Sequence, residues 1–94
     1  MKLVGKPIIE EFLLRHADAR GPLAAWCKEV ENSRWGLPQD IKDRYQSASI
    51  LSDNRVIFNI KGNSYRLVVV VGYQNGIVRV EWLGTHAEYD RMRF

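Results

Sequence analysis

The spacing of apolar residues divides the chain into a helical first third and a sheet-forming second half. After KLVG, which is typical of a short strand, an apolar stripe at helical spacing follows Pro7, and proline is favoured in the first turn of a helix. The members of this stripe are Ile8, Ile9, Phe12 and Leu13. DARGP interrupts the pattern, and a second stripe after Pro22 consists of Leu23, Trp26, Cys27 and Val30. The two stripes predict a short helical hairpin whose apolar sides face a core.

The second half of the chain has the pattern of β-strands. Three segments rich in Val, Ile and aromatic residues are joined by the turn-forming sequences KGNS and QNGI. They span about residues 55–60, 65–73 and 77–83. Asn75-Gly76 is the stronger turn signal, because a type I′ turn needs positive φ at both central residues, and Gly62-Asn63 can form the same turn. Before the strands, SRWGLPQDIKDRYQSAS predicts a loop with one helical turn near residues 40–44.

These elements predict an α+β fold in which a helical hairpin packs on one face of a mostly antiparallel sheet. The sheet should consist of the short N-terminal strand and a three-strand meander. No repeat, linker or low-complexity segment stands out in the sequence, so we expect residues 1–94 to form a single domain.

The turns also predict how the strands pair. If each turn has a two-residue loop, Asn59 lies opposite Arg66, and Arg66 lies opposite Thr85. Because side chains alternate between the faces of a sheet, this register separates an apolar set from a polar one. The apolar face, which the helices should cover, holds Val56, Phe58, Ile60, Tyr65, Leu67, Val69, Val71, Val78, Val80 and Trp82. The open face holds Asn59, Lys61, Arg66, Arg79, Glu81 and Thr85, with Val68, Val70 and Leu83 among them.

Composition narrows the class of protein. The chain has 94 residues, 46% of them hydrophobic and 27% charged, which is typical of a globular rather than a disordered chain. The longest apolar run, at residues 67–71, is too short to span a bilayer, and the N-terminus turns acidic too early for a signal peptide. We therefore expect a cytoplasmic protein with no membrane partner. The single cysteine, Cys27, excludes an internal disulfide and a cysteine-based zinc site, and its spacing predicts a core position.

Charge and the residues after the last strand suggest chemistry on an anion. The net charge of +3 and the pI near 9.2 are compatible with nucleic-acid binding without establishing it. Lys61 and Arg66 on the open face can hold a phosphate, and His86, at the end of the last strand, can transfer protons near neutral pH. Tyr89 can stack on a base or donate a hydrogen bond. No metal or cofactor is needed, and two distant histidines make a poor metal site.

Each of these side chains also has a structural explanation. His86 can be a capping or surface residue at a strand end, Tyr89 can cover the sheet edge, and Lys61 can be a solvated hairpin lysine. THAE predicts a capping box between Thr85 and Glu88 whatever His86 does. Arg66 is harder to explain in this way, because an arginine that opens a central strand requires an anionic partner.

Two motifs carry a resemblance to a known family. FNIKGNSYRLVVVV, followed by VEWLGTHAEYD, resembles the HigB family of toxins, which are ribosome-associated mRNA endoribonucleases of the RelE-like group. The resemblance covers nearly the whole chain, and its most specific elements are GN-x-x-R and GTH-x-EYD. It implies a cytoplasmic bacterial toxin that cleaves mRNA on translating ribosomes. It also implies a HigA-type helix-turn-helix antitoxin as partner, with operator DNA contacted only through that antitoxin.

The resemblance extends to individual residues. Arg66 falls where RelE-like toxins keep a phosphate-binding arginine, just after the hairpin. His86 falls near a second basic position, where other members have arginine, so its role as acid or as charge stabiliser stays open. Tyr89 matches only approximately a tyrosine near the end of some relatives.

The resulting hypothesis is an endoribonuclease in which the 2′-OH of the RNA attacks the adjacent phosphorus, leaving a 2′,3′-cyclic phosphate and a 5′-OH. Its candidate catalytic residues are Arg66, His86, Lys61 and Tyr89, and its candidate substrate-binding residues are Asn59, Asn63 and Arg79. Glu88, Asp90 and Lys61 are the candidates for general base. Two alternatives remain: a catalytically silent partner in a DNA-binding repressor complex, and a generic basic RNA-binding module.

Overall fold

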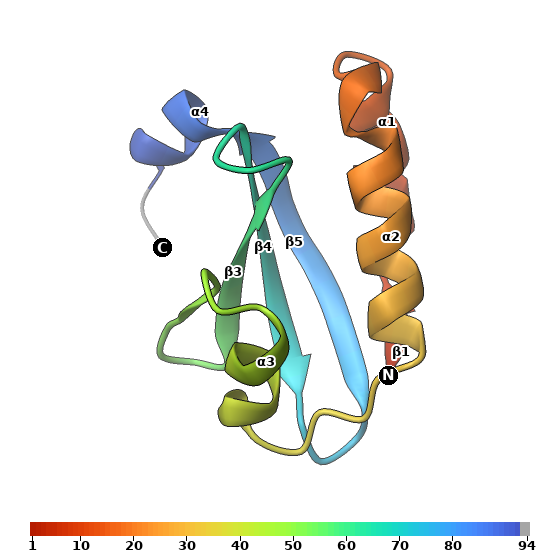
Figure 1. The fold of residues 1–94 in the computed structure, drawn as a ribbon, viewed down its shortest axis with the longest axis vertical. Coiled ribbons are helices and arrows are strands. Elements are labelled where there is room, and N and C mark those ends of the chain that lie inside the picture. The colour runs from red at the N-terminus through yellow and green to blue at the C-terminus, as the bar shows by residue number, and fades with distance from the viewer. Residues whose placement is uncertain (93–94) are drawn as a thin grey trace.

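The computed structural model of the protein describes residues 1–92, in which two helices cover one face of a five-stranded sheet (Figure 1). In chain order the elements are β1 (Lys2–Val4), α1 (Lys6–Leu13), the 3₁₀ helix η1 (Ala17–Ala19), α2 (Arg20–Glu31), α3 (Pro38–Arg44), β2 (Ser49–Ile50), β3 (Arg55–Ile60), β4 (Tyr65–Gly72), β5 (Ile77–Thr85) and α4 (His86–Asp90). None of the helices within residues 1–92 is long and apolar enough to cross a membrane.

The sheet has the order β1-β5-β4-β3-β2. β1 is parallel to β5, and all other neighbours are antiparallel. The predicted opening strand, helical hairpin, helical turn near residues 40–44 and three-strand meander are all present, which confirms the α+β class. The two-residue edge strand β2 was not predicted. It pairs with β3 through a tight turn whose central residues, Asp53 and Asn54, have φ of 60° and 61°.

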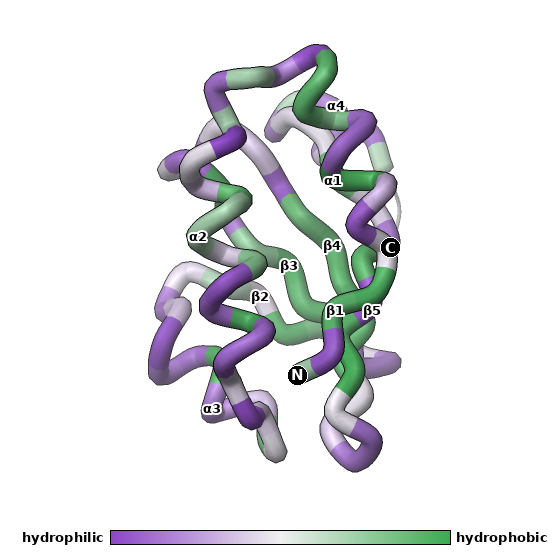
Figure 2. The backbone as a smooth tube through the Cα atoms, turned by 90° about the vertical axis from the view of Figure 1, so that its right-hand side faces the viewer, coloured by the Kyte–Doolittle hydropathy of each residue, from purple (hydrophilic) through white to green (hydrophobic). Residues whose placement is uncertain are grey.

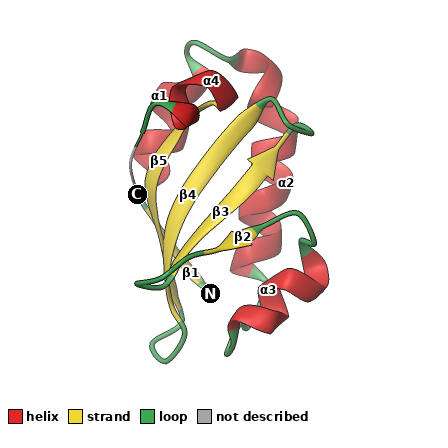
Figure 3. Cartoon of the chain, turned by 90° about the vertical axis from the view of Figure 1, so that its left-hand side faces the viewer, coloured by secondary structure: helices red, strands yellow, loops and turns green. Residues whose placement is uncertain are grey.

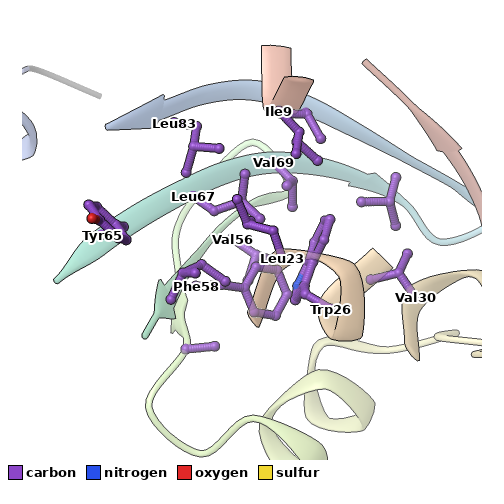
Figure 4. Packing of buried hydrophobic residues seen from close by; sticks show 14 of the residues in the cluster. Ile9, Leu23, Trp26, Val30, Val56, Phe58, Tyr65, Leu67, Val69 and Leu83 are labelled. Atoms are coloured by element: carbon purple, nitrogen blue, oxygen red, sulfur yellow. The ribbon is translucent and has the colours of Figure 1, made fainter. Parts of the chain in front are cut away.

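The core lies between the helices and the sheet. Figure 2, seen from the helical side, shows the apolar strands of the sheet behind α1 and α2. Gly5 follows β1 and has φ of 99°, and a Cβ added there would collide with the carbonyl of Val80. Pro7, in the first turn, then starts α1. Helices α1 and α2 contribute five buried side chains to this core: Ile9, Phe12, Leu23, Trp26 and Val30. In Figure 4, Trp26 packs beside Phe58 of β3, and their ring centroids are 5.3 Å apart. Cys27 is only half-buried and packs at the margin of this core rather than within it.

The β3–β4 hairpin has the predicted register, because Asn59 pairs with Arg66. Its turn differs from the prediction. Positive φ occurs at Lys61 (53°) and Gly62 (63°), whereas Gly62-Asn63 was expected to form the central pair. Four residues join β3 to β4 whichever pair has positive φ, so Asn59 still pairs with Arg66. The positive φ at Lys61 changes the direction of its side chain.

The β4–β5 hairpin does not have the predicted register. Gly72 pairs with Ile77, so the loop contains four residues rather than two, and Gly76 has positive φ while Asn75 does not. Farther along, a β-bulge at Glu81 shifts the pairing again. As a result, Arg66 faces Gly84 and not Thr85.

The bulge also reverses the predicted sorting at the end of β5. An extra residue in one strand moves all following side chains to the other face. Leu83 therefore pairs with Leu67 and is buried on the covered face, whereas Trp82 pairs with Val68 on the open face. Thr85, predicted for the open face, instead pairs with Tyr65.

Candidate functional site at the hairpin and the C-terminal helix

Arg66 and His86 are both bonded to the β3–β4 hairpin, at the end of the sheet where α4 begins. Arg66 Nη1 donates a hydrogen bond to the carbonyl of Asn63 at 3.2 Å. The backbone N–H of His86 donates to the next carbonyl, that of Ser64, at 3.1 Å. Figure 3 looks onto this face, with α4 lying beyond the ends of β4 and β5. Two adjacent carbonyls of one hairpin thus hold the guanidinium of Arg66 and the backbone of His86.

The position of α4 depends on the predicted capping box, which the structure confirms. The hydroxyl of Thr85 accepts from the N–H of Glu88 at 3.1 Å, and the Glu88 carboxylate accepts from the N–H of Thr85 at 2.8 Å. These bonds satisfy two backbone donors at the helix start. The backbone hydrogen bond from Thr85 lowers the pKa of Glu88. The carboxylate of Glu88 therefore has a structural role in starting α4.

His86 is the first residue of α4 and pairs with the last. Its Nδ1 lies 3.0 Å from Oδ2 of Asp90, one helical turn away. Nearly half of the imidazole side chain, 47%, is exposed. Because Asp90 engages Nδ1, the other ring nitrogen, Nε2, is the one available to a substrate.

Tyr89 lies on α4 beside an aromatic residue that the sequence pattern had assigned to the core. The ring centroids of Tyr89 and Trp82 are 6.1 Å apart, and both side chains are partly buried. Trp82 was missed as a site residue because only the bulge at Glu81 brings it to the open face. No sequence signal marks that bulge.

Lys61 does not lie with Arg66, contrary to the prediction. Its ammonium group forms an ion pair of 2.6 Å with Asp18 of η1, and the same carboxylate accepts a 2.6 Å hydrogen bond from Tyr65, a covered-face residue. The positive φ of Lys61 and the carboxylate of Asp18 together account for this placement. The hydrogen bonds from Lys61 and Tyr65, in that order, lower the pKa of Asp18.

The predicted substrate-binding residues divide into two groups. Asn59 faces Arg66 across the ladder and donates from its amide to the carbonyl of Ser47 at 3.2 Å, while Asn63 lies exposed in the hairpin. Arg79 is also on the open face but pairs with Val70, four residues along β4 from Arg66. That separation is about 13 Å at the usual strand rise. Its guanidinium lies 3.8 Å from Glu81, so Arg79 belongs to another part of the face.

A comparison with protein families identifies the chain. The family model described as HigB_toxin, the RelE-like toxic component of a toxin–antitoxin system, matches residues 19–92. The chain belongs to the HigB toxin family. A comparison with curated proteins returned no match.

As a HigB toxin, the protein is the RelE-like toxin component of a toxin–antitoxin system and has an antitoxin as partner. The matched residues include β3, β4, β5 and α4, the elements that build the corner around Arg66 and His86. Within residues 1–92, the HigB toxin has no group of three or more His, Cys, Asp or Glu side chains placed to hold a metal ion.

Proposed function

We propose that this toxin is an endoribonuclease that cleaves mRNA at the corner formed by the β3–β4 hairpin and α4. The observation that carries the proposal is the attachment of Arg66 and His86 to adjacent carbonyls of one hairpin. A guanidinium binds phosphate and stabilises charge that builds up on it, and an imidazole can give a proton to a leaving oxygen.

The reaction uses the 2′-OH of the RNA as nucleophile. Its oxygen attacks the adjacent phosphorus, and the guanidinium of Arg66 stabilises the charge on the pentacoordinate phosphate. The bond from phosphorus to the 5′ oxygen breaks, and Nε2 of His86 protonates that oxygen. The products are a 2′,3′-cyclic phosphate and a 5′-OH. These steps use the chain's own side chains and require no metal or cofactor.

Asp90 is a positioning residue in this scheme. Its carboxylate, 3.0 Å from Nδ1 of His86, orients the ring so that Nε2 faces the substrate, and it stabilises the protonated imidazole. The other candidates for general base also have structural partners, because Glu88 caps α4 and Lys61 pairs with Asp18. We therefore assign no general base among them. The proton of the 2′-OH passes to water at this exposed surface.

The natural substrate in this proposal is mRNA on a translating ribosome. The corner is small and open, so the ribosome supplies the alignment of the RNA that a binding cleft would otherwise supply. A HigA-type helix-turn-helix antitoxin neutralises the toxin, and operator DNA is contacted only through that antitoxin. Asn59 and Asn63 lie close enough to Arg66 to bind the same nucleotides.

Expression in cells, with and without the co-expressed antitoxin, tests the proposal. Growth and the 5′ ends of cellular RNA are measured for the wild type and for Arg66→Ala as matched control. We expect growth arrest and discrete new 5′-OH ends with wild type alone, and neither with the variant or with the antitoxin present. A silent repressor partner would not arrest growth. A generic RNA-binding module would arrest growth without discrete cut sites.

A further inference from the structure

Trp82 is the only one of the three tryptophans that the fold directs to the open face. Trp26 and Trp35 are core residues with 2% and 5% exposure. Trp82 is partly buried and pairs with Val68, on the face that also carries Arg66 and Asn59. The bulge causes this placement, because Glu81 is inserted between Val80 and Trp82 in the pairing with β4.

Gly84 lets the indole of Trp82 lie along the strand. A Cβ at Gly84 would come within 2.5 Å of the indole Cζ2, so any larger residue would displace the ring. Gly84 is the residue that faces Arg66 across the ladder. The benzene part of the indole therefore lies over Gly84, whose backbone is one strand spacing, about 5 Å, from that of Arg66.

Tyr89 lies beside the indole. The two ring planes are inclined at 51°, with centroids 6.1 Å apart. An aromatic surface thus lies on the open face next to the helix that carries His86, over the residue that pairs with Arg66. Aromatic faces bind nucleobases by stacking, and arginine binds the phosphate of the same or the next nucleotide.

We propose that Trp82 is a stacking surface for one nucleobase beside the cut site, with Gly84 as the residue that keeps the indole in place. The ligand is a single-stranded nucleotide whose phosphate contacts Arg66 and whose base lies on the indole. This inference rests on the proposed ribonuclease function and adds a substrate-binding residue to it. It predicts that cleavage depends on the presence of a base at one position next to the scissile phosphate.

The experiment uses a defined ribosome complex that carries a short mRNA with one mapped cut site. Each nucleotide flanking the cut is replaced in turn by an abasic one, and kcat and KM are measured. At the stacked position, the abasic mRNA should lower wild-type kcat/KM by roughly 5- to 150-fold, mostly through KM, as loss of one stacked base does. Trp82→Leu should show the same loss on the intact mRNA and no further loss on the abasic one.

Two more variants separate stacking from packing. Trp82→Phe keeps an aromatic face and should keep most of the activity. Gly84→Ala leaves the indole in the chain but displaces it, so it should raise KM while kcat changes little. Thermal unfolding of all variants provides the structural readout.

Several results would overturn the inference. Trp82→Leu with wild-type cleavage would do so, as would an equal loss on intact and abasic mRNA together with a lower Tm, because the indole would then only hold α4. If Trp82→Leu does not fold, the abasic scan with wild type decides, and no sensitive position means no stacking. Normal cleavage by Arg66→Ala would instead refute the proposed function itself, independently of Trp82.

Discussion

The two faces of the sheet are built for different tasks. The covered face carries apolar side chains from β3, β4 and β5, and those at Val56, Leu67, Val71 and Val78 have no exposed surface. The open face alternates between the apolar residues Ile57 and Val68, which are also buried, and polar residues such as Asn59 and Arg66. Within residues 1–92, no polar or charged residue is buried.

This difference teaches that stability and proposed chemistry can be changed separately. Burial of apolar surface against α1 and α2 stabilises the fold, so the covered face has no room for a charge. Arg66 and His86 lie where the backbone is held by strand pairing and by the hairpin, while the side chains contact solvent. Removing a charge there leaves the core intact.

The strongest test of the covered face is Phe58→Ala. Phe58 has 1% exposure and contacts three aromatic rings, so the variant should lose about 3–5 kcal/mol of unfolding free energy. Asn59→Ala, the next residue on the opposite face, is the matched control. It loses one side-chain hydrogen bond and should cost about 0.5–1.5 kcal/mol. Urea unfolding measures both, and equal losses would contradict the division between the faces.

The corresponding test of the open face is Arg66→Ala. Loss of a preorganised contact to the phosphate should cost roughly 2–4 kcal/mol in the transition state of cleavage, with little change in Tm. Arg66→Lys should rescue only part of the activity, because lysine lacks the planar fork. Cleavage rates and thermal unfolding are measured on the same preparations. A variant that cuts at the wild-type rate would remove Arg66 from the site.

His86→Gln and Thr85→Ala separate chemistry from capping within two adjacent residues. His86→Gln keeps a polar side chain without a titratable proton and should reduce cleavage roughly 100-fold or more at unchanged Tm.

Thr85→Ala should do the reverse of His86→Gln. It removes the hydroxyl that caps α4 and should cost about 0.5–2 kcal/mol of stability, affecting cleavage only indirectly. Thermal unfolding and cleavage are compared for both variants. If His86→Gln melts early and cuts normally, the histidine is structural and the proposed acid is wrong.

The smallest effect concerns the rim of the covered face, where Asp18 holds Lys61 and Tyr65. The pKa of Asp18 is lowered in the folded state, so the carboxylate stabilises the fold above its unfolded pKa of about 3.9. That contribution is lost as pH falls through the lower folded pKa. Asp18→Asn should therefore be less stable than wild type at pH 7, and the difference should shrink below about pH 4.

Urea unfolding at pH 7 and pH 2.5 measures this difference. Asp43→Asn on the exposed side of α3 is the matched control for the change in charge. A stability difference for Asp18→Asn that is the same at both pH values would show that the ionised carboxylate does not link η1 to the hairpin.

Some features of the site were predictable because they are local. The capping box of Thr85 and Glu88 needs only residues three apart, and the pairing of Asn59 with Arg66 needs only a short hairpin. Lys61 was misplaced, because its partner Asp18 is 43 residues away in sequence. The local sequence of the β3–β4 hairpin does not indicate that Asp18 will lie beside it, and the local sequence around Asp18 does not indicate the hairpin.

The end of β5 shows the limit of pattern-based sorting. Alternation assigned Trp82 to the core and Leu83 to the open face, and one inserted residue at Glu81 reversed both. A strand with apolar residues at consecutive positions can be buried on either side, so its pattern does not reveal a bulge. The catalytic roles of Arg66 and His86 stay predictions.

By itself, the sequence determined the class of fold, the helical and extended segments, the covered face of β3 and β4, and the cap that starts α4, because each follows from periodicity or from contacts a few residues apart. Only the tertiary structure decided which side of the sheet Trp82 joins and that Asp18 holds Lys61 away from Arg66. These outcomes depend on backbone geometry at single residues and on partners brought together by packing. No local pattern encodes them, because the free energy that selects them comes from contacts between segments distant in the chain.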